Sequence, residues 1–203
     1  MAEYIGFATL PDARKAGVLY AAALGSSQLR DANAARLAVK SLEDLARSEP
    51  AAHRLARLLR AEIELAAGGA EAALAALGNA PHGTTALARP ELFLRTQALL
   101  RLGRAAEGTG ALQTWVVSHP RDAAAWQWLA SCWQAQGQPL RAVRAEAEAH
   151  AMRYDYAAAV DRFKAGQDLA RRGGPQVDHI EASIIDTRLR AVESLLREQA
   201  AER

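Results

Sequence analysis

Two residues on one predicted helix have the types and the spacing of a metal-binding pair. Glu146 and His150 stand four positions apart, so both side chains point to the same face of a helix. Carboxylate and imidazole groups are common zinc ligands, but a zinc site takes at least three ligands from the protein. Because no third ligand stands nearby in the sequence, the pair favours a salt bridge or a solvated helix surface over a metal centre.

No other group of residues follows a known catalytic pattern. The chain has no H-E-x-x-H sequence, no G-x-S-x-G sequence and no phosphate-binding glycine-rich loop. The one cysteine, Cys132, falls within an apolar helix, where a small buried side chain is expected. We therefore expect this chain to have no catalytic residue, no metal and no cofactor, and not to be an enzyme. The alternative is an enzyme that uses Glu146 and His150 or the segment 78–90, and stoichiometric zinc in the purified protein would favour its metal form.

The elements that hold these residues are predicted to be helices. Alanine, the strongest helix former, supplies 49 of the 203 residues, whereas β-branched and aromatic residues are sparse. The net charge is only +2, and basic residues are scattered among acidic ones at helical spacing, which argues against a nucleic-acid partner. No stretch has the apolar length of a membrane span, so we expect no direct membrane insertion. The first residues also lack the pattern of a secretory signal.

Turn residues recur along the chain at a nearly constant interval. Gly68, Gly103 and Gly137 each follow one apolar-periodic helix and precede another, at intervals of 35 and 34 residues. One interval before Gly68 stands Asn33, and asparagine is the residue that most often replaces glycine in a left-handed turn. This period predicts a helical hairpin that repeats along the chain.

The stretch that holds three of the four tryptophans carries the pattern of one helical family. Four of its residues form a single helical stripe at i, i+3, i+4 and i+7, namely Trp126, Leu129, Ala130 and Trp133. Ala142 on the next predicted helix offers the matching small surface, and Gly137 lies at the turn between the two helices. This arrangement resembles the tetratricopeptide repeat. The resemblance implies an all-α fold, an α-solenoid in which helical hairpins stack into a right-handed superhelix.

On this resemblance, the whole chain (1–203) is a single tetratricopeptide-repeat domain with a C-terminal capping helix. The other repeats match more weakly, as is usual where each helix needs only an apolar stripe. Tyr154 occupies the turn position of a half repeat. The predicted segments are repeats at about 13–50, 51–86, 89–120 and 121–153, a half repeat at 139–172 that shares a helix, and the capping helix at 177–200. The apolar face of the capping helix is predicted to consist of Ile180, Ile184, Ala191, Leu195 and Leu196.

In the tetratricopeptide family, the first helix of each repeat lines a concave groove that holds a protein or peptide segment. The groove positions of the family fall here on Phe93, Gln97, Arg101, Gln127, Trp128, Ser131, Gln134, Arg144 and Glu148. Trp128 lies off the stripe of Trp126 and Trp133, and an aromatic side chain beside a groove can anchor a bound segment. The alternative is that Trp128 packs on a neighbouring helix or on the segment 78–90.

The C-terminal half carries a second, more specific resemblance. Residues 144–150, 154–163 and 187–196 follow the HP-x-D-x-x-x-W sequence at 119–126. This order is similar to the end of the tetratricopeptide half of bacterial periplasmic zinc metallopeptidases of the β-barrel-assembly-enhancing type. The resemblance implies the non-catalytic repeat half of a metalloprotease in outer-membrane protein quality control. It also implies a periplasmic location and contacts with a zinc protease domain and with outer-membrane assembly proteins.

The sequence leaves a second function open. The chain can instead be a stand-alone tetratricopeptide adaptor or assembly factor with no link to a protease, for which a cytoplasmic location is expected. None of the metal ligands of the protease family has a counterpart in this chain. An H-E-x-x-H sequence encoded in frame upstream of Met1 would favour the protease over the adaptor.

Overall fold

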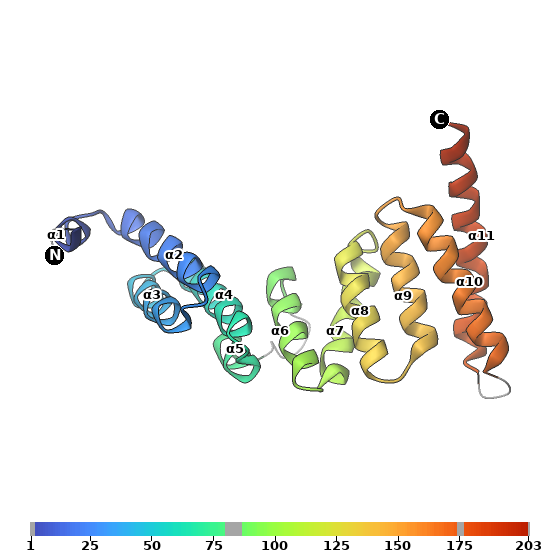
Figure 1. The fold of residues 1–203 in the computed structure, drawn as a ribbon, viewed down its shortest axis with the longest axis horizontal. Helices are drawn as coiled ribbons and strands as arrows, with labels where there is room; N and C mark the ends of the chain where they lie inside the picture. Colours follow the sequence, from blue (N-terminus) through green and yellow to red (C-terminus); the bar gives the residue numbers. More distant parts are fainter. Residues whose placement is uncertain (1–2, 80–86, 174–176, 203) are drawn as a thin grey trace. The chain divides into compact units, whose positions relative to one another are not determined.

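The computed structural model describes residues 3–79, 87–173 and 177–202. Eleven helices and no strand occupy these ranges, and Figure 1 labels the helices in chain order. The all-helical fold class that the alanine content predicts is therefore confirmed for the described residues. The chain divides into two compact units, Met1–Leu102 and Gly103–Arg203. The prediction of one repeat domain over 1–203 stays a prediction.

The first unit contains six of the described helices. They are α1 (Glu3–Ala8), α2 (Asp12–Gln28), α3 (Ala32–Leu45), α4 (Pro50–Ala66), α5 (Ala70–Leu77) and α6 (Arg89–Arg101). From α2 onward, each helix packs against the next one along the chain, and α4 also lies beside both α2 and α6. These three alternate helices therefore form one row within the unit.

The second unit contains the other five described helices. They are α7 (Ala105–Ser118), α8 (Ala123–Ala135), α9 (Pro139–Ala151), α10 (Tyr156–Arg172) and α11 (His179–Ala201). Each helix again packs against the next one along the chain, and α9 also contacts α11. The last three helices therefore form a compact group of their own.

Aspartate side chains determine where four of the helices begin. The carboxylate before each of α3, α8, α10 and α11 accepts a hydrogen bond from the backbone N–H three residues further on, at 3.0 to 3.3 Å. These four N-cap residues are Asp31, Asp122, Asp155 and Asp178. Each carboxylate satisfies a donor that the first helical turn leaves free. Pro50 and Pro139 begin α4 and α9, where the missing N–H of proline costs nothing.

A single residue with a positive φ angle follows five of the helices. These residues are Arg30, Gly68, Gly103, Gly137 and Tyr154, with φ between 62° and 84°. The next residue in each case is the N-cap of the following helix. Within each unit, its N–H closes the turn: Gly69 donates to the carbonyl of Glu64 at 2.7 Å, and Gln138 donates to that of Trp133 at 2.9 Å. These turns within the units bring consecutive helices side by side with only a few linking residues.

The first of these turns differs from the sequence-based prediction. Asn33 is predicted to take the left-handed conformation, but Arg30 takes it, with φ 62°, and Asn33 lies inside α3. The reason is Asp31, whose carboxylate accepts a hydrogen bond from Ala34 at 3.0 Å and so starts the helix before Asn33. Tyr154 does have the left-handed conformation that its predicted turn position requires.

Small residues let the helices approach closely in both cores. In the second unit Phe163 is fully buried in a core cluster that combines Ala147, Ala151 and Ala159 with larger aliphatic residues. Gly166 of α10 faces α11, where an added Cβ atom would lie only 3.1 Å from the Cδ1 atom of Ile185. In the first unit the cores likewise combine alanine with a few leucine, isoleucine and valine side chains. Close packing of such small side chains is what the high alanine content provides.

The last helix buries a different face from the predicted one. Ile185, Leu189 and Val192 are buried, whereas Ile180 and Leu195 of the predicted stripe are 77% and 37% exposed. Leu196 of the predicted stripe does pack against the core, but the stripe as a whole is wrong in its register along the helix. The buried face also carries two charged residues that pair with α9, as described below, and a search for apolar residues alone does not locate such a face.

The turn geometry predicts opposite effects for two glycine-to-alanine substitutions in the second unit. Neither glycine has any atom within 4 Å of the position that a Cβ would take, but Gly137 has φ +67° and Gly110 lies within α7. We expect Gly137→Ala to lower the free energy of unfolding by about 1 kcal/mol because of its left-handed backbone. Gly110→Ala is expected to raise it by about 0.5–1 kcal/mol through helix propensity.

Urea unfolding, monitored by circular dichroism, measures the free energy of unfolding of both variants. Each variant serves as the control for the other, because each substitution adds one methyl group where no other atom is close. Equal effects of the same sign at the two positions would contradict the assigned turn.

Candidate functional site

A groove of about 610 Å³ lies in the first unit, along the row formed by α2, α4 and α6. Tyr20 of α2, Leu55 and Leu58 of α4 and Leu94 of α6 are among its lining residues. Most of the lining is apolar, and Glu62 is the one carboxylate among the residues that line it. The groove therefore offers contacts to hydrophobic groups, with a single negative charge beside them.

Two large side chains of this groove remain in solvent. Leu55 is 65% exposed and Tyr20 is 47% exposed, whereas Leu59 behind them is 3% exposed. Full burial of a leucine side chain is worth about 1.5–3 kcal/mol. Binding of a partner that covers the groove would bury these side chains, and the free energy of their burial would then favour the complex.

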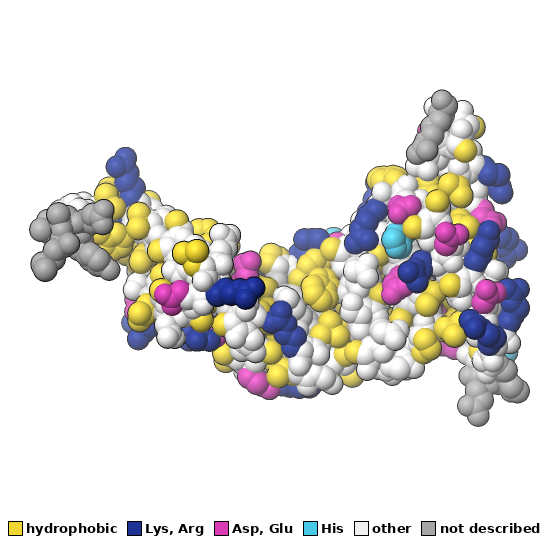
Figure 2. Space-filling model, viewed as in Figure 1, with side chains coloured by type: hydrophobic (Ala, Val, Ile, Leu, Met, Phe, Trp, Pro, Cys, Tyr) yellow, Lys and Arg dark blue, Asp and Glu magenta, His cyan; other side chains and the backbone are white. Residues whose placement is uncertain are grey.

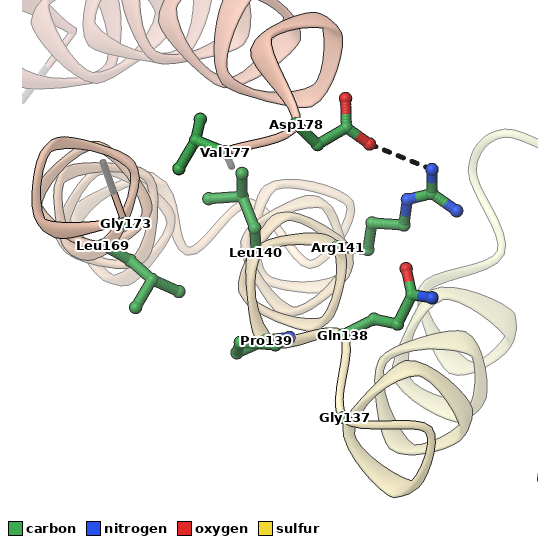
Figure 3. A pocket seen from close by; sticks show the side chains of 9 residues that line it. All are labelled: Gly137, Gln138, Pro139, Leu140, Arg141, Leu169, Gly173, Val177 and Asp178. Carbon is green, nitrogen blue, oxygen red and sulfur yellow. Dashed lines mark hydrogen bonds and ion pairs between the residues drawn. The ribbon is translucent and has the colours of Figure 1, made fainter. Parts of the chain in front are cut away.

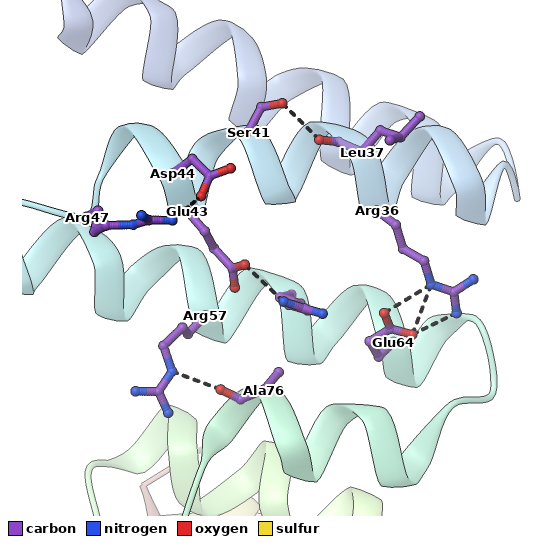
Figure 4. A network of polar contacts seen from close by, with 10 residues as sticks. Arg36, Leu37, Ser41, Glu43, Asp44, Arg47, Arg57, Glu64 and Ala76 are labelled. Atoms are coloured by element: carbon purple, nitrogen blue, oxygen red, sulfur yellow. Dashed lines mark hydrogen bonds and ion pairs between the residues drawn. The ribbon is translucent and has the colours of Figure 1, made fainter.

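Ion pairs between helices hold the groove helices in place. Arg36 of α3 binds the carboxylate of Glu64 on α4 through three contacts of 2.7 to 3.1 Å (Figure 4). Glu64 is 4% exposed, and its pKa is lowered, mainly by the hydrogen bond from Arg36. Arg54 of α4 donates to Glu91 of α6 at 2.8 Å. Arg54 is the residue before the groove residue Leu55 in the sequence. These charge-assisted hydrogen bonds therefore fix the positions of the helices that line the groove.

The predicted groove residues of α6 do not line this groove. Phe93 is half-buried, and the guanidinium of Arg89 lies 4.4 Å from the centroid of its ring. Arg101 is exposed, and its guanidinium donates to the carbonyl of Leu65 at the end of α4. Gln97 is half-buried. From the same helix, Pro90 and Leu94 line the groove instead.

The predicted groove residues of α8 belong to the second unit. Gln127, Trp128 and Ser131 are half-buried, and Gln134 is exposed. The Ser131 hydroxyl donates to the carbonyl of Gln127 at 3.2 Å, within the helix itself. These four residues share one helix, but no described pocket includes them.

The remaining two predicted groove residues, Arg144 and Glu148 of α9, bind side chains of α11. Arg144 pairs with Glu181, and Glu148 accepts two hydrogen bonds from Arg188, at 2.6 and 2.8 Å. Glu148 and Glu181 are only 5% and 6% exposed. Their charges are thus satisfied within the unit, where they hold the last helix against α9.

Two arginines of α9 each lie between a tryptophan ring of α8 and a carboxylate at or near the start of α11. The Arg141 guanidinium lies 5.0 Å from the ring centroid of Trp133 and donates to Asp178 at 2.9 Å. The Arg144 guanidinium lies 5.8 Å from the ring centroid of Trp126. Each arginine is therefore attracted to an aromatic face on α8 and to a carboxylate at or near the start of α11.

The tryptophans themselves pack as parts of the scaffold. Trp133 is 7% exposed, and Trp126 is half-buried with its indole N–H donating to the carbonyl of Pro120 at 2.9 Å. In Figure 2, basic and acidic side chains are interspersed over the surface of the last helices. This mixed surface agrees with the ion pairs that join α9 and α11.

A smaller cleft of about 280 Å³ lies near the start of α9 (Figure 3). Pro139 and Leu140 face Leu169 of α10 across it, and Val177 lies at the beginning of the last segment. The Arg141–Asp178 pair forms one wall of this cleft (Figure 3). Because both charges of the pair are already neutralised, the cleft offers mainly a small apolar contact.

The described residues contain no group of three or more histidine, cysteine, aspartate or glutamate side chains that could hold a metal ion. Glu146 lies 3.6 Å from Arg162, and the Nδ1 atom of His150 lies 3.4 Å from a carboxylate oxygen of Asp155. Each member of the predicted pair thus has a partner of its own. Most of the segment 78–90, the other candidate, lies outside the described residues.

The single thiol is in an inert environment. Cys132 is fully buried in α8, as the sequence predicts, and burial raises the pKa of its thiol from 9.0 to about 11. A thiol with such a pKa is protonated at neutral pH, and the thiolate is the reactive form. Cys132 therefore contributes to packing.

No known protein-family model and no curated protein sequence matches this chain. Among the described helices, none combines the length and the apolar character that a membrane span requires.

The ion pair between α9 and α11 predicts how the last helix is held. We expect Arg188→Met to lower the free energy of unfolding by about 2 kcal/mol, because Glu148 is left buried without its cation. The expected cost is below the roughly 3–5 kcal/mol of a fully buried pair, since the Arg188 side chain is 35% exposed.

The double variant Glu148→Met with Arg188→Met is the control, because it removes both charges together. It should recover most of the lost stability in urea unfolding. A double variant as unstable as Arg188→Met alone would contradict the role given to this pair.

Proposed function

We infer that this chain is a protein-binding scaffold whose groove along α2, α4 and α6 takes hydrophobic side chains of a partner segment. The observation that carries the proposal is the exposure of Tyr20 and Leu55 within a groove of about 610 Å³. Large apolar side chains that gather in a concave surface are typical of binding sites. Tyr20 is of a residue type that often dominates binding, and burial of Leu55 would add the free energy of removing apolar surface from water.

The proposed architecture is an α-solenoid of tetratricopeptide type that forms a right-handed superhelix. Contacts between helices one hairpin apart support it. Arg54 and Glu91, which join α4 to α6, are 37 residues apart, and so are Arg144 and Glu181, which join α9 to α11. A spacing of this size is close to the length of one tetratricopeptide repeat. The turns with positive φ at the end of each first helix support the same proposal.

The link to a periplasmic zinc metallopeptidase rests on the C-terminal sequence pattern. On this proposal the chain is the non-catalytic repeat half of the enzyme. It would then contact a protease domain and outer-membrane assembly proteins. The groove in the first unit is equally suited to a stand-alone adaptor, so the binding function does not depend on the protease link.

Substitution of Leu55 tests the binding function. Random peptides displayed on phage are selected on the wild-type chain, and the affinities of the selected peptides are then measured for Leu55→Asp. We expect the selected peptides to share large apolar residues. They should bind Leu55→Asp at least about tenfold more weakly, because the substitution removes one leucine contact and places a charge in the groove.

Leu29→Asp is the matched control, since Leu29 is 84% exposed in the same unit but does not line the groove. Its peptide affinity should equal that of the wild type, and circular dichroism should show both variants folded. Peptides that bind Leu55→Asp as tightly as the wild type, or a selection that enriches no peptides, would contradict the proposed groove.

A further inference from the structure

Two arginines from different helices converge on the carboxyl end of α5. The Arg57 guanidinium of α4 donates to the carbonyl of Ala76 at 2.8 Å (Figure 4). It also donates to the carbonyl of Leu77. The Arg95 guanidinium of α6 donates to the carbonyl of Gly78 at 2.7 Å. Arginine side chains that cap a helix end in this way are common, because they interact favourably with the free carbonyls there.

Helix capping alone does not account for the net positive charge at the carboxyl end of α5. In the described residues, Arg57 and Arg95 have only backbone carbonyls as hydrogen-bond partners. Glu91, a carboxylate that interacts electrostatically with both arginines, already accepts a hydrogen bond from Arg54 at 2.8 Å. These three arginines and one glutamate leave two positive charges, and the end of a helix contributes only about half a negative charge.

The sequence beyond α5 offers nothing to neutralise this excess. Residues 79–88 read NAPHGTTALA and contain no aspartate or glutamate. Burial lowers the pKa of the Arg95 guanidinium, and repulsion from Arg57 lowers it further, although Glu91 acts in the opposite direction. The two guanidinium groups are therefore close enough to disfavour each other.

Buried polar atoms without partners lie on the same two helices. Among the described residues, the buried Nε atom of Arg95 has no hydrogen-bond acceptor, and the buried Nδ1 atom of His53, one turn before Arg57 on α4, has no partner either. Unsatisfied buried donors are rare in folded proteins, and a charged one is costly. A guanidinium holds five N–H donors in a fixed plane, so both arginines keep donors that the carbonyls do not use.

We propose that Arg57 and Arg95 form a binding site for a phosphate-like oxyanion at the carboxyl end of α5. A phosphate dianion carries two negative charges, which match the two uncompensated positive charges of the cluster. Its tetrahedral oxygens can accept hydrogen bonds from two guanidinium groups at once, and arginine is the side chain best suited to such contacts. The site is separate from the apolar groove, because neither arginine lines that groove.

Thermal unfolding in phosphate tests this site, with inorganic phosphate as the probe and chloride of equal ionic strength as the reference. At 100 mM phosphate we expect the midpoint of unfolding of the wild-type chain to rise by about 4 °C. Acetate at the same ionic strength is expected to give a clearly smaller rise, because it carries a single charge. The variants Arg57→Gln and Arg95→Gln should each lose most of the phosphate-specific rise while keeping a side-chain donor for the carbonyls.

Arg14→Gln is the matched control, because Arg14 is an exposed arginine of α2 in the same unit, and it should respond as the wild type does. Phosphate strengthens hydrophobic burial in any protein, so only the difference between the variants and the control counts. An equal rise in all variants, or an equal rise in acetate and phosphate, would overturn the proposal.

A measurement on the wild-type chain covers the case in which a variant does not fold. The Nε–Hε resonances of arginine are followed by NMR during a phosphate titration to 100 mM. We expect a few of these resonances to shift with saturation, with the others unchanged. No saturable shift in any arginine resonance would overturn the proposal independently of the variants.

Discussion

The structure depends on one backbone constraint, the left-handed residue that ends a helix and reverses the chain. Within the two units it occurs at Arg30, Gly68, Gly137 and Tyr154. In these four turns the N–H of the following residue donates to the carbonyl five positions earlier, at 2.7 to 3.1 Å. Because the next helix begins at once, the two helices are forced to lie side by side. Alanine then becomes useful, since small side chains allow the close approach that the turn imposes.

Helices one hairpin apart come into contact as a consequence of these turns. Arg54 on α4 can reach Glu91 on α6, and Glu148 on α9 can reach Arg188 on α11. The groove of the first unit also arises this way, because alternate helices of one row supply all of its lining residues except Leu42 of α3. A surface of this kind consists of residues far apart in the sequence, held by turns that lie outside it. The binding function that we propose therefore depends on the turns as much as on Tyr20 and Leu55.

The sequence predicts the helices and most of the turns because each has a local cause. Glycine tolerates a positive φ angle at Gly68, Gly103 and Gly137, and an apolar stripe marks each helix. Asn33 fails as a turn residue because the carboxylate of Asp31 starts the helix earlier. Whether Asp31 or Asn33 determines the turn depends on one hydrogen bond, and the spacing of turn residues in the sequence does not reveal that bond.

The candidate site is harder to predict, because it depends on which charged residues are paired. Arg144 and Glu148 have the family positions of groove residues, but partners on α11 neutralise both. The same pairing shifts the buried face of α11 away from the stripe expected from apolar residues. Tyr20 and Leu55 could have been noticed as large apolar residues outside the helical stripes. That they share one groove follows only from the contacts between helices.

Nuclear magnetic resonance can test the left-handed turns most directly. A positive φ angle shortens the distance between the amide hydrogen and the Hα of the same residue. Among the described non-glycine residues, only Arg30 and Tyr154 have a positive φ, of 62° each. The account predicts that these two residues show intraresidue amide–Hα cross-peaks distinctly stronger than those of their helical neighbours. Cross-peaks of ordinary helical intensity at both residues would contradict the hairpin turns on which the fold and the groove depend.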